Sequence, residues 1–151
     1  AKMNPPLRTE EDRLSMIQGL KDGHIDCIAT DHAPHEQSSK DLPISNAAFG
    51  IIGLETMLPL SLELYHKGEM GLIKLLQKLT CNPAEIINLK KGQIQKGWIA
   101  DLVLFDLNHE WSITIDEFAS KSKNSPFDGR KVRGRAIRTI VSGKTTYSLE
   151  I

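Results

Sequence analysis

Residues 25–35 limit most strongly how this chain can fold, because a short apolar run ends there in ionisable residues. The run is too short for a helix and indicates a buried strand. Pro34 cannot donate a ladder hydrogen bond, so we expect the strand to end near Asp31. Ligands lie at the carboxyl ends of strands in barrels and open α/β sheets, so a functional site is expected there. A capping Asp beside the ordinary loop histidines His32 and His35 would give the same pattern, which by itself names no reaction.

Composition excludes several classes of function. Lys plus Arg and Asp plus Glu are equal at 19 each, which argues against nucleic acid or an anionic membrane as a partner. No apolar run is long enough to cross a bilayer. Cys27 and Cys81 are isolated, and we interpret them as reduced thiols of a cytoplasmic protein.

The first 90 residues are predicted to be largely helical outside residues 25–31. A capping Thr9 and a terminating Gly23 predict one helix between them. Further helices are expected over residues 53–66 and 71–80, where Pro59 would kink the first unless that helix starts late. Asn82 as N-cap and Pro83 as first residue predict a fourth helix.

From residue 91 the pattern changes to short alternating segments separated by turns, which is typical of β-structure. Strands are predicted over residues 102–106, 111–114, 133–141 and 145–149, with a helical turn over 115–120 and a hairpin turn at 142–144.

Two loops could contribute to a site. Asn4 precedes Pro5-Pro6 in a stiff loop, where its amide could contact a ligand or simply form a turn. Residues 36–50 form a polar loop with the composition of a mobile lid. Phe49 and Gly50 close it, either as ligand contacts or as a core Phe and a turn Gly.

Several motifs resemble one enzyme family. Residues 23–35, ending in Thr-Asp-His-Ala-Pro-His, closely resemble the last barrel strand of bacterial dihydroorotases, which belong to the cyclic amidohydrolase superfamily. Residues 2–8 resemble the loop that precedes this strand. Residues 92–103 resemble the returning β-segment of the superfamily, and residues 124–129 followed by Gly134 and residues 141–144 resemble its C-terminal end. The resemblance therefore covers essentially the whole chain.

This resemblance implies an α/β fold with two parts. Residues 1–90 would be the C-terminal part of a metal-dependent (β/α)8 TIM barrel, with its last strand and helices, and residues 91–151 a segment of a small β-rich domain. A complete barrel takes ~250 residues. We therefore expect an incomplete portion of a longer enzyme, whose N-terminal part completes the barrel, and expect this chain alone to hold no catalytic zinc and to be inactive.

The resemblance also implies a chemistry. Dihydroorotases interconvert dihydroorotate and N-carbamoyl-L-aspartate in pyrimidine biosynthesis, using zinc. Asp31 would be both the catalytic base and a zinc ligand, with the remaining ligands outside this chain. Asn4, His35, Phe49 and Gly50 would bind the small-molecule substrate, and His32 would be a supporting residue. A homodimer is expected, and aspartate transcarbamoylase is a candidate partner.

Two other functions stay open. The chain could belong to an allantoinase or a hydantoinase, which share the later motifs. It could also belong to a non-catalytic dihydroorotase-like scaffold for aspartate transcarbamoylase. The presence of Asp31 and His35 argues against a loss of site residues in this part of the protein.

Overall fold

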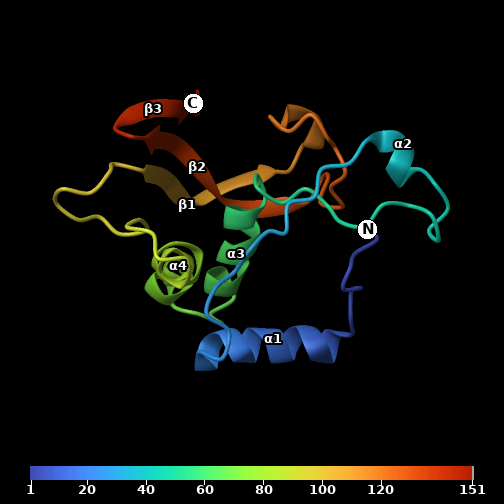
Figure 1. Cartoon of the computed structure of the whole chain (residues 1–151), viewed down its shortest axis with the longest axis horizontal. Helices are drawn as coiled ribbons and strands as arrows, with labels where there is room; N and C mark the ends of the chain where they lie inside the picture. Colours follow the sequence, from blue (N-terminus) through green and yellow to red (C-terminus); the bar gives the residue numbers. More distant parts are fainter. Residues whose placement is uncertain (151) are drawn as a thin grey trace.

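A computed structural model describes residues 1–150 of the chain as an α/β structure (Figure 1). The helices and strands, in chain order, are α1 (Glu10–Asp22), α2 (Gln37–Lys40), α3 (Met57–His66), α4 (Leu72–Leu79), α5 (Cys81–Ile86), β1 (Leu102–Ser112), the 3-10 helix η1 (Ile115–Glu117), β2 (Lys131–Val141) and β3 (Lys144–Ser148).

The three strands form one antiparallel sheet in the order β1-β2-β3. The strands predicted over 102–106 and 111–114 are one strand, β1, whose pairing with β2 is irregular between Asp106 and Glu110. Here two short apolar segments joined by one polar stretch belong to a single bulged strand. Ser142 and Gly143 both have positive φ, 50° and 78°, which suits a two-residue hairpin between β2 and β3.

Helix α1 begins and ends where its capping residues predict. Thr9 Oγ1 accepts a hydrogen bond from Asp12 N at 3.3 Å, and Thr9 N donates to Asp12 Oδ2 at 3.1 Å, so both N-terminal donors have partners. Gly23 ends the helix with a φ of 86°.

Helix α3 packs against the sheet and carries much of the core. It starts late, at Met57, so Pro59 lies in the first turn, where a missing N–H disrupts nothing. Gly134 of β2 lies so close to Leu62 of α3 that any side chain there would overlap it. The two clusters of buried apolar residues are Ile52, Ile113, Phe118 and Val132, and Leu62, Met70 and Leu75.

The predicted start of the helix at Asn82 and Pro83 is wrong. Helix α5 begins at Cys81, so Asn82 lies inside the helix and is not its N-cap. The Asn82 side chain instead donates to the main-chain oxygen of Asp26 at 2.8 Å. The Asn82 side chain is therefore engaged by a residue 56 positions away in sequence, and does not cap the helix as the local pattern predicted.

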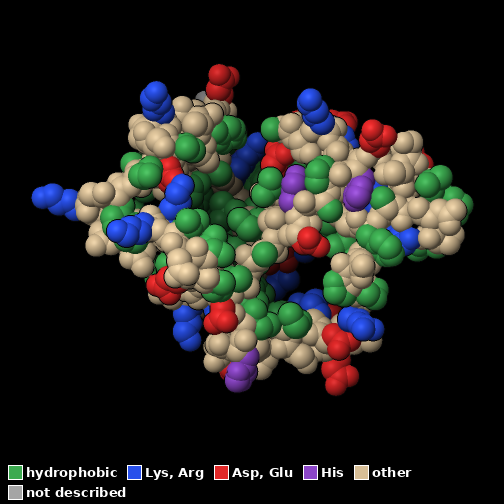
Figure 2. Space-filling view, viewed as in Figure 1, with side chains coloured by type: hydrophobic (Ala, Val, Ile, Leu, Met, Phe, Trp, Pro, Cys, Tyr) green, Lys and Arg blue, Asp and Glu red, His purple; other side chains and the backbone are tan. Residues whose placement is uncertain are grey.

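Figure 1 shows α3 between the sheet and α1, with the chain from α1 to α2 crossing beside α3. Apolar side chains gather in the hollow near the centre of the face in Figure 2, and side chains of both charges are interspersed around it. Among residues 1–150, no helix combines the length and the apolar character that a membrane span requires.

Candidate functional site

In Figure 1 the chain that leaves α1 runs extended towards α2, but residues 25–35 do not form the predicted strand. Ile28 N donates to Lys78 O at 2.9 Å, and the Lys78 side chain donates to Ile25 O, so α4 supplies hydrogen bonds that a neighbouring strand would otherwise give. A strand needs a ladder partner. Within residues 1–150, β1, β2 and β3 pair only with one another, so this segment has none.

Asp31 stands where this segment turns. Its side chain is exposed, and its φ of 45° lies in the left-handed region, which few residues other than Gly adopt and in which Asp is enriched. None of the salt bridges among residues 1–150 involves it. The turn therefore presents a carboxylate to solvent at the end of the extended segment.

His32 faces the protein instead. Its Nδ1 atom accepts a hydrogen bond from Gly53 N at 3.1 Å, which fixes the ring against the chain that leads into α3. Gly53 also packs closely on Thr30, since an added Cβ would lie 3.1 Å from Thr30 Cβ. This geometry agrees with a supporting role for His32.

His35, Phe49 and Gly50 come together, as expected for one site. His35 Nε2 lies 2.6 Å from Phe49 O, and Ala33 N donates to Ile51 O at 2.9 Å, so the two loops are joined side by side. Gly50 has a φ of 103°, and an added Cβ would lie 2.5 Å from Ala33 Cβ. Only glycine suits this position, because of both its backbone angle and the close approach.

The loop that carries Asn4 reaches the same place. Gly50 N donates to Lys2 O at 2.7 Å, two residues before Asn4, whose own side chain is exposed. The structure thus brings the segments of Asn4, His35 and Phe49–Gly50 together around one loop.

Three polar residues that the sequence interpretation missed hold these loops. Lys40 Nζ donates to Ala48 O at 2.7 Å and to Gly50 O at 2.9 Å. Lys2 Nζ donates to Ala47 O at 2.8 Å and lies 4.2 Å from the centre of the Phe49 ring. Asn124, between η1 and β2, bonds to both loops. Most of these contacts join residues far apart in sequence, so no local pattern could have signalled them.

The residues 36–50 are less irregular than expected. They include α2, Lys40 of α2 bonds to their second half, and Lys2 ties that half to the N-terminal segment. Whether this loop acts as a lid stays a prediction.

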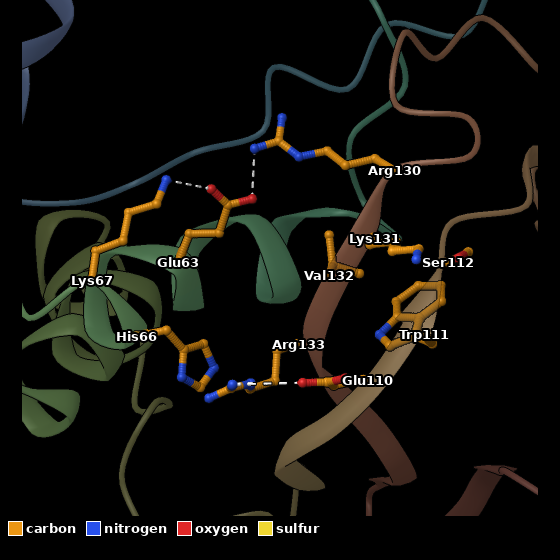
Figure 3. A pocket seen from close by; sticks show the side chains of 10 residues that line it. All are labelled: Glu63, His66, Lys67, Glu110, Trp111, Ser112, Arg130, Lys131, Val132 and Arg133. Atoms are coloured by element: carbon orange, nitrogen blue, oxygen red, sulfur yellow. Dashed lines mark hydrogen bonds and ion pairs between the residues drawn. The ribbon is translucent and has the colours of Figure 1, made fainter.

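A cavity of about 750 Å³ lies elsewhere, between α3 and the ends of β1 and β2 (Figure 3). Glu63 lies there between Lys67, at 2.9 Å, and Arg130, at 2.6 Å. Partial burial acts to raise the pKa of the Glu63 carboxyl, but the hydrogen bonds and charges of Lys67 and Arg130 outweigh it, so this pKa lies below its usual range. None of the predicted site residues lines this cavity or a second, more apolar one of about 450 Å³ beside Trp111.

The described residues do not make a complete metal site. Among residues 1–150, no group of three or more His, Cys, Asp or Glu side chains is arranged to hold a metal ion. Catalytic zinc takes three protein ligands as a rule. The exposed Asp31 carboxylate suits one such ligand, and the Nδ1 atom of His32 is already engaged by Gly53.

Comparison with known proteins identifies the family. Residues 4–146 match the model described as the amidohydrolase family. The chain belongs to the amidohydrolase family. The resemblance that rests on the Thr-Asp-His-Ala-Pro-His motif is thereby confirmed.

This amidohydrolase chain is similar to curated dihydroorotases. It is 74% identical over 148 residues to the dihydroorotase of Wolbachia sp. subsp. Drosophila simulans (strain wRi), which covers 98% of the chain and 34% of that protein. It is 68% identical over 151 residues to the dihydroorotase of Ehrlichia chaffeensis, covering 100% of the chain and 34% of that protein. The chain thus spans about a third of the length of these relatives.

Solved structures similar to this amidohydrolase chain include a hydantoinase and a dihydropyrimidinase. The L-hydantoinase (dihydropyrimidinase) of Arthrobacter aurescens matches with a TM-score of 0.92 and 33% identity, over 97% of this chain and 34% of that one. The dihydropyrimidinase of Brevibacillus agri matches with a TM-score of 0.89 and 26% identity, over 97% of this chain and 33% of that one.

Proposed function

We propose that the complete gene product carrying this chain is a dihydroorotase, which interconverts dihydroorotate and N-carbamoyl-L-aspartate in pyrimidine biosynthesis. The observation that carries this proposal is the 74% identity over 148 residues to a curated dihydroorotase. The activity belongs to the whole protein, because the chain spans only about a third of that relative.

In this proposal, residues 1–90 are the C-terminal part of a (β/α)8 barrel and residues 91–151 belong to a β-rich domain. The segment 25–31 has no strand partner within residues 1–150. This is expected of a barrel strand whose neighbouring strands lie outside this chain. Leu14 of α1 and Ile73 of α4 are 51% and 70% exposed, as expected if further protein packs on these helices. The buried cluster around Ile52 contains residues from each side of position 90, and the partly buried Phe105 and Leu107 pack against the other cluster, so the two parts would share a core.

Asp31 would be the catalytic base. The reaction needs a group that takes a proton from the attacking water and returns it to the ring nitrogen as the C–N bond breaks. An exposed carboxylate held at a left-handed turn, on a segment anchored by α4 and α5, suits that role. Asp31 would also supply one zinc ligand, with the others outside this chain. When bound, zinc polarises the amide carbonyl and makes water a better nucleophile near neutral pH.

The substrate carboxylate would be bound by the loops that meet at Gly50. Asn4 and His35 would supply side-chain donors, and Phe49 and Gly50 would supply the main chain. Gly50 N and Gly50 O are both engaged within the chain, by Lys2 and by Lys40 with Asn124. We therefore expect Gly50 to contribute by letting the two loops approach closely at Ala33, and the main-chain N–H of Phe49 to donate to the substrate carboxylate.

A hydantoinase is the second candidate, supported by the TM-score of 0.92 to the Arthrobacter aurescens enzyme. Sequence identity favours a dihydroorotase, at 74% against 33%. An allantoinase, and a non-catalytic scaffold for aspartate transcarbamoylase, are further outcomes that an assay can separate. We also propose a homodimer in the cytoplasm, to be checked by mass measurement in solution and by fractionation.

The test is to express the complete gene product, load it with zinc, and measure kcat/KM on dihydroorotate, hydantoin and allantoin. A dihydroorotase should prefer dihydroorotate by at least about a hundredfold, since its site would hold polar groups for the carboxylate. Preference for hydantoin or allantoin would overturn the proposal, and no turnover of any of the three would favour the scaffold.

A further inference from the structure

We infer that Asn124 is a positioning residue, which holds His35 and the Phe49–Gly50 main chain in the arrangement that binds substrate. This inference rests on the proposed function for the meaning of the two loops. Asn124 itself lies in neither loop. It belongs to the connection between η1 and β2, 89 residues after His35 and 74 after Gly50.

The Asn124 side chain is partly buried and bonds to both loops at once. Its Oδ1 atom accepts from His35 N at 3.3 Å, and its Nδ2 atom donates to Ala33 O at 2.9 Å and to Gly50 O at 3.3 Å. Its main-chain oxygen accepts from Ile52 N at 3.2 Å. One residue thus fixes the chain on either side of Pro34, directly before the His35 side chain, and on either side of Ile51.

The chemistry of these contacts selects an amide. Two carbonyl oxygens need donors and one N–H needs an acceptor, and a carboxamide offers both on one short side chain. Aspartate has the same shape but would place an oxygen against the carbonyls of Ala33 and Gly50. Alanine would leave His35 N and Ala33 O to find other partners and would leave Gly50 O with Lys40 alone, at a cost comparable to lost hydrogen bonds.

The direct contacts between the loops are few, which gives Asn124 its importance. Their hydrogen bonds are those from Ala33 N to Ile51 O, from Gly53 N to His32 Nδ1, and between His35 Nε2 and Phe49 O. Without Asn124, the Gly50 carbonyl would keep only Lys40, a long side chain from the same loop. We therefore expect the His35 ring and the Phe49 carbonyl to lose their fixed separation, which affects substrate binding more than the proton transfer at Asp31.

The experiment compares Asn124→Ala and Asn124→Asp in the zinc-loaded complete gene product. Ser125→Ala is the matched control, because among residues 1–150 the one hydrogen bond of Ser125 Oγ comes from Phe127 N in its own segment, at 3.3 Å. Two readouts are used. One is KM and kcat on dihydroorotate, and the other is amide hydrogen exchange over residues 31–37 and 47–53, with α1 as internal reference.

Both Asn124 variants should raise KM about tenfold or more while kcat falls less than about threefold, and amides in both loops should exchange about tenfold faster, as loss of one hydrogen bond implies. Ser125→Ala should match the wild type. KM values within twofold of the control, or unchanged exchange in both loops, would overturn the inference. Asn124→Asp keeps the shape of the side chain, so its KM and exchange rates test the inference if Asn124→Ala fails to fold. If the wild type does not turn over dihydroorotate, the proposed function fails, while hydrogen exchange still decides whether Asn124 holds the loops.

Discussion

The Nε2 atom of His35 lies 2.6 Å from the main-chain oxygen of Phe49. Because a carbonyl oxygen can only accept, Nε2 carries the proton of this hydrogen bond. Nδ1 can then donate to a substrate carboxylate only when the ring is also protonated there. A cationic His35 would therefore donate at both ends, to Phe49 and to the substrate.

Replacing His35 by Ala should mainly weaken substrate binding. The variant loses a charge-assisted hydrogen bond worth roughly 1.5–3 kcal/mol, so KM for dihydroorotate should rise roughly tenfold to a hundredfold with a smaller change in kcat. His24→Ala is the control, since His24 is exposed and lies before the extended segment. An unchanged KM in His35→Ala would remove His35 from the binding site.

Gly50→Ala should weaken substrate binding at the same site by pushing the two loops apart. The new Cβ would lie 2.5 Å from Ala33 Cβ, and the backbone at φ 103° disfavours any side chain, which costs about 1–3 kcal/mol. KM for dihydroorotate should rise about tenfold or more. Gly97→Ala is the matched control, because Gly97 also has positive φ, 85°, but has open space around its Cβ position. Equal kinetics for the two variants would mean that the close approach to Ala33 does not matter.

Glu63→Gln should change the pH dependence of stability. Lys67 and Arg130 hold the pKa of the Glu63 carboxyl below its usual range in the folded protein. Its stabilising contribution is therefore fully present above the unfolded pKa of about 4.3 and is lost as pH falls through the lower folded value. The wild type should exceed Glu63→Gln by about 0.5–1 kcal/mol in unfolding free energy near neutral pH.

Urea unfolding between about pH 3 and 7 measures this difference, which should shrink as the solution becomes acidic, below the unfolded pKa. Glu85→Gln, an exposed carboxylate in none of the salt bridges of residues 1–150, is the control. A difference that is constant across this range would contradict the role given to the Lys67 and Arg130 charges.

Local signals predicted much of the fold. Thr9 and Gly23 marked both ends of α1 correctly, because caps act within one turn. The predicted start of α3 at residue 53 is wrong, and the helix takes the late start that Pro59 left open; Ser142-Gly143 located the hairpin. The errors arose where a distant contact decided the structure. Asn82 bonds to Asp26 O and so does not cap α5, and residues 25–31 remain without a ladder within residues 1–150.

The same distinction between local signals and distant contacts applies to the candidate site. The resemblance of short motifs was enough to select His35, Phe49 and Gly50, and the structure brings them together. It could not reveal Lys40 or Asn124 as the residues that hold those loops. Lys40 and Asn124 hold the loops through hydrogen bonds to main-chain oxygens. Every residue has a main-chain oxygen, so no pattern of side chains indicates which of them will be bound.

The most direct test of the account is the turnover of dihydroorotate by the zinc-loaded complete gene product with Asp31→Asn. The amide keeps the shape of the carboxylate but is a poor base, so kcat should fall by at least about a hundredfold while the melting temperature stays close to that of the wild type. Asp26→Asn, the same substitution at an exposed position of the same segment, should keep wild-type kcat. Asp31→Asn activity within a few-fold of the wild type would contradict the assignment of Asp31 as the catalytic base.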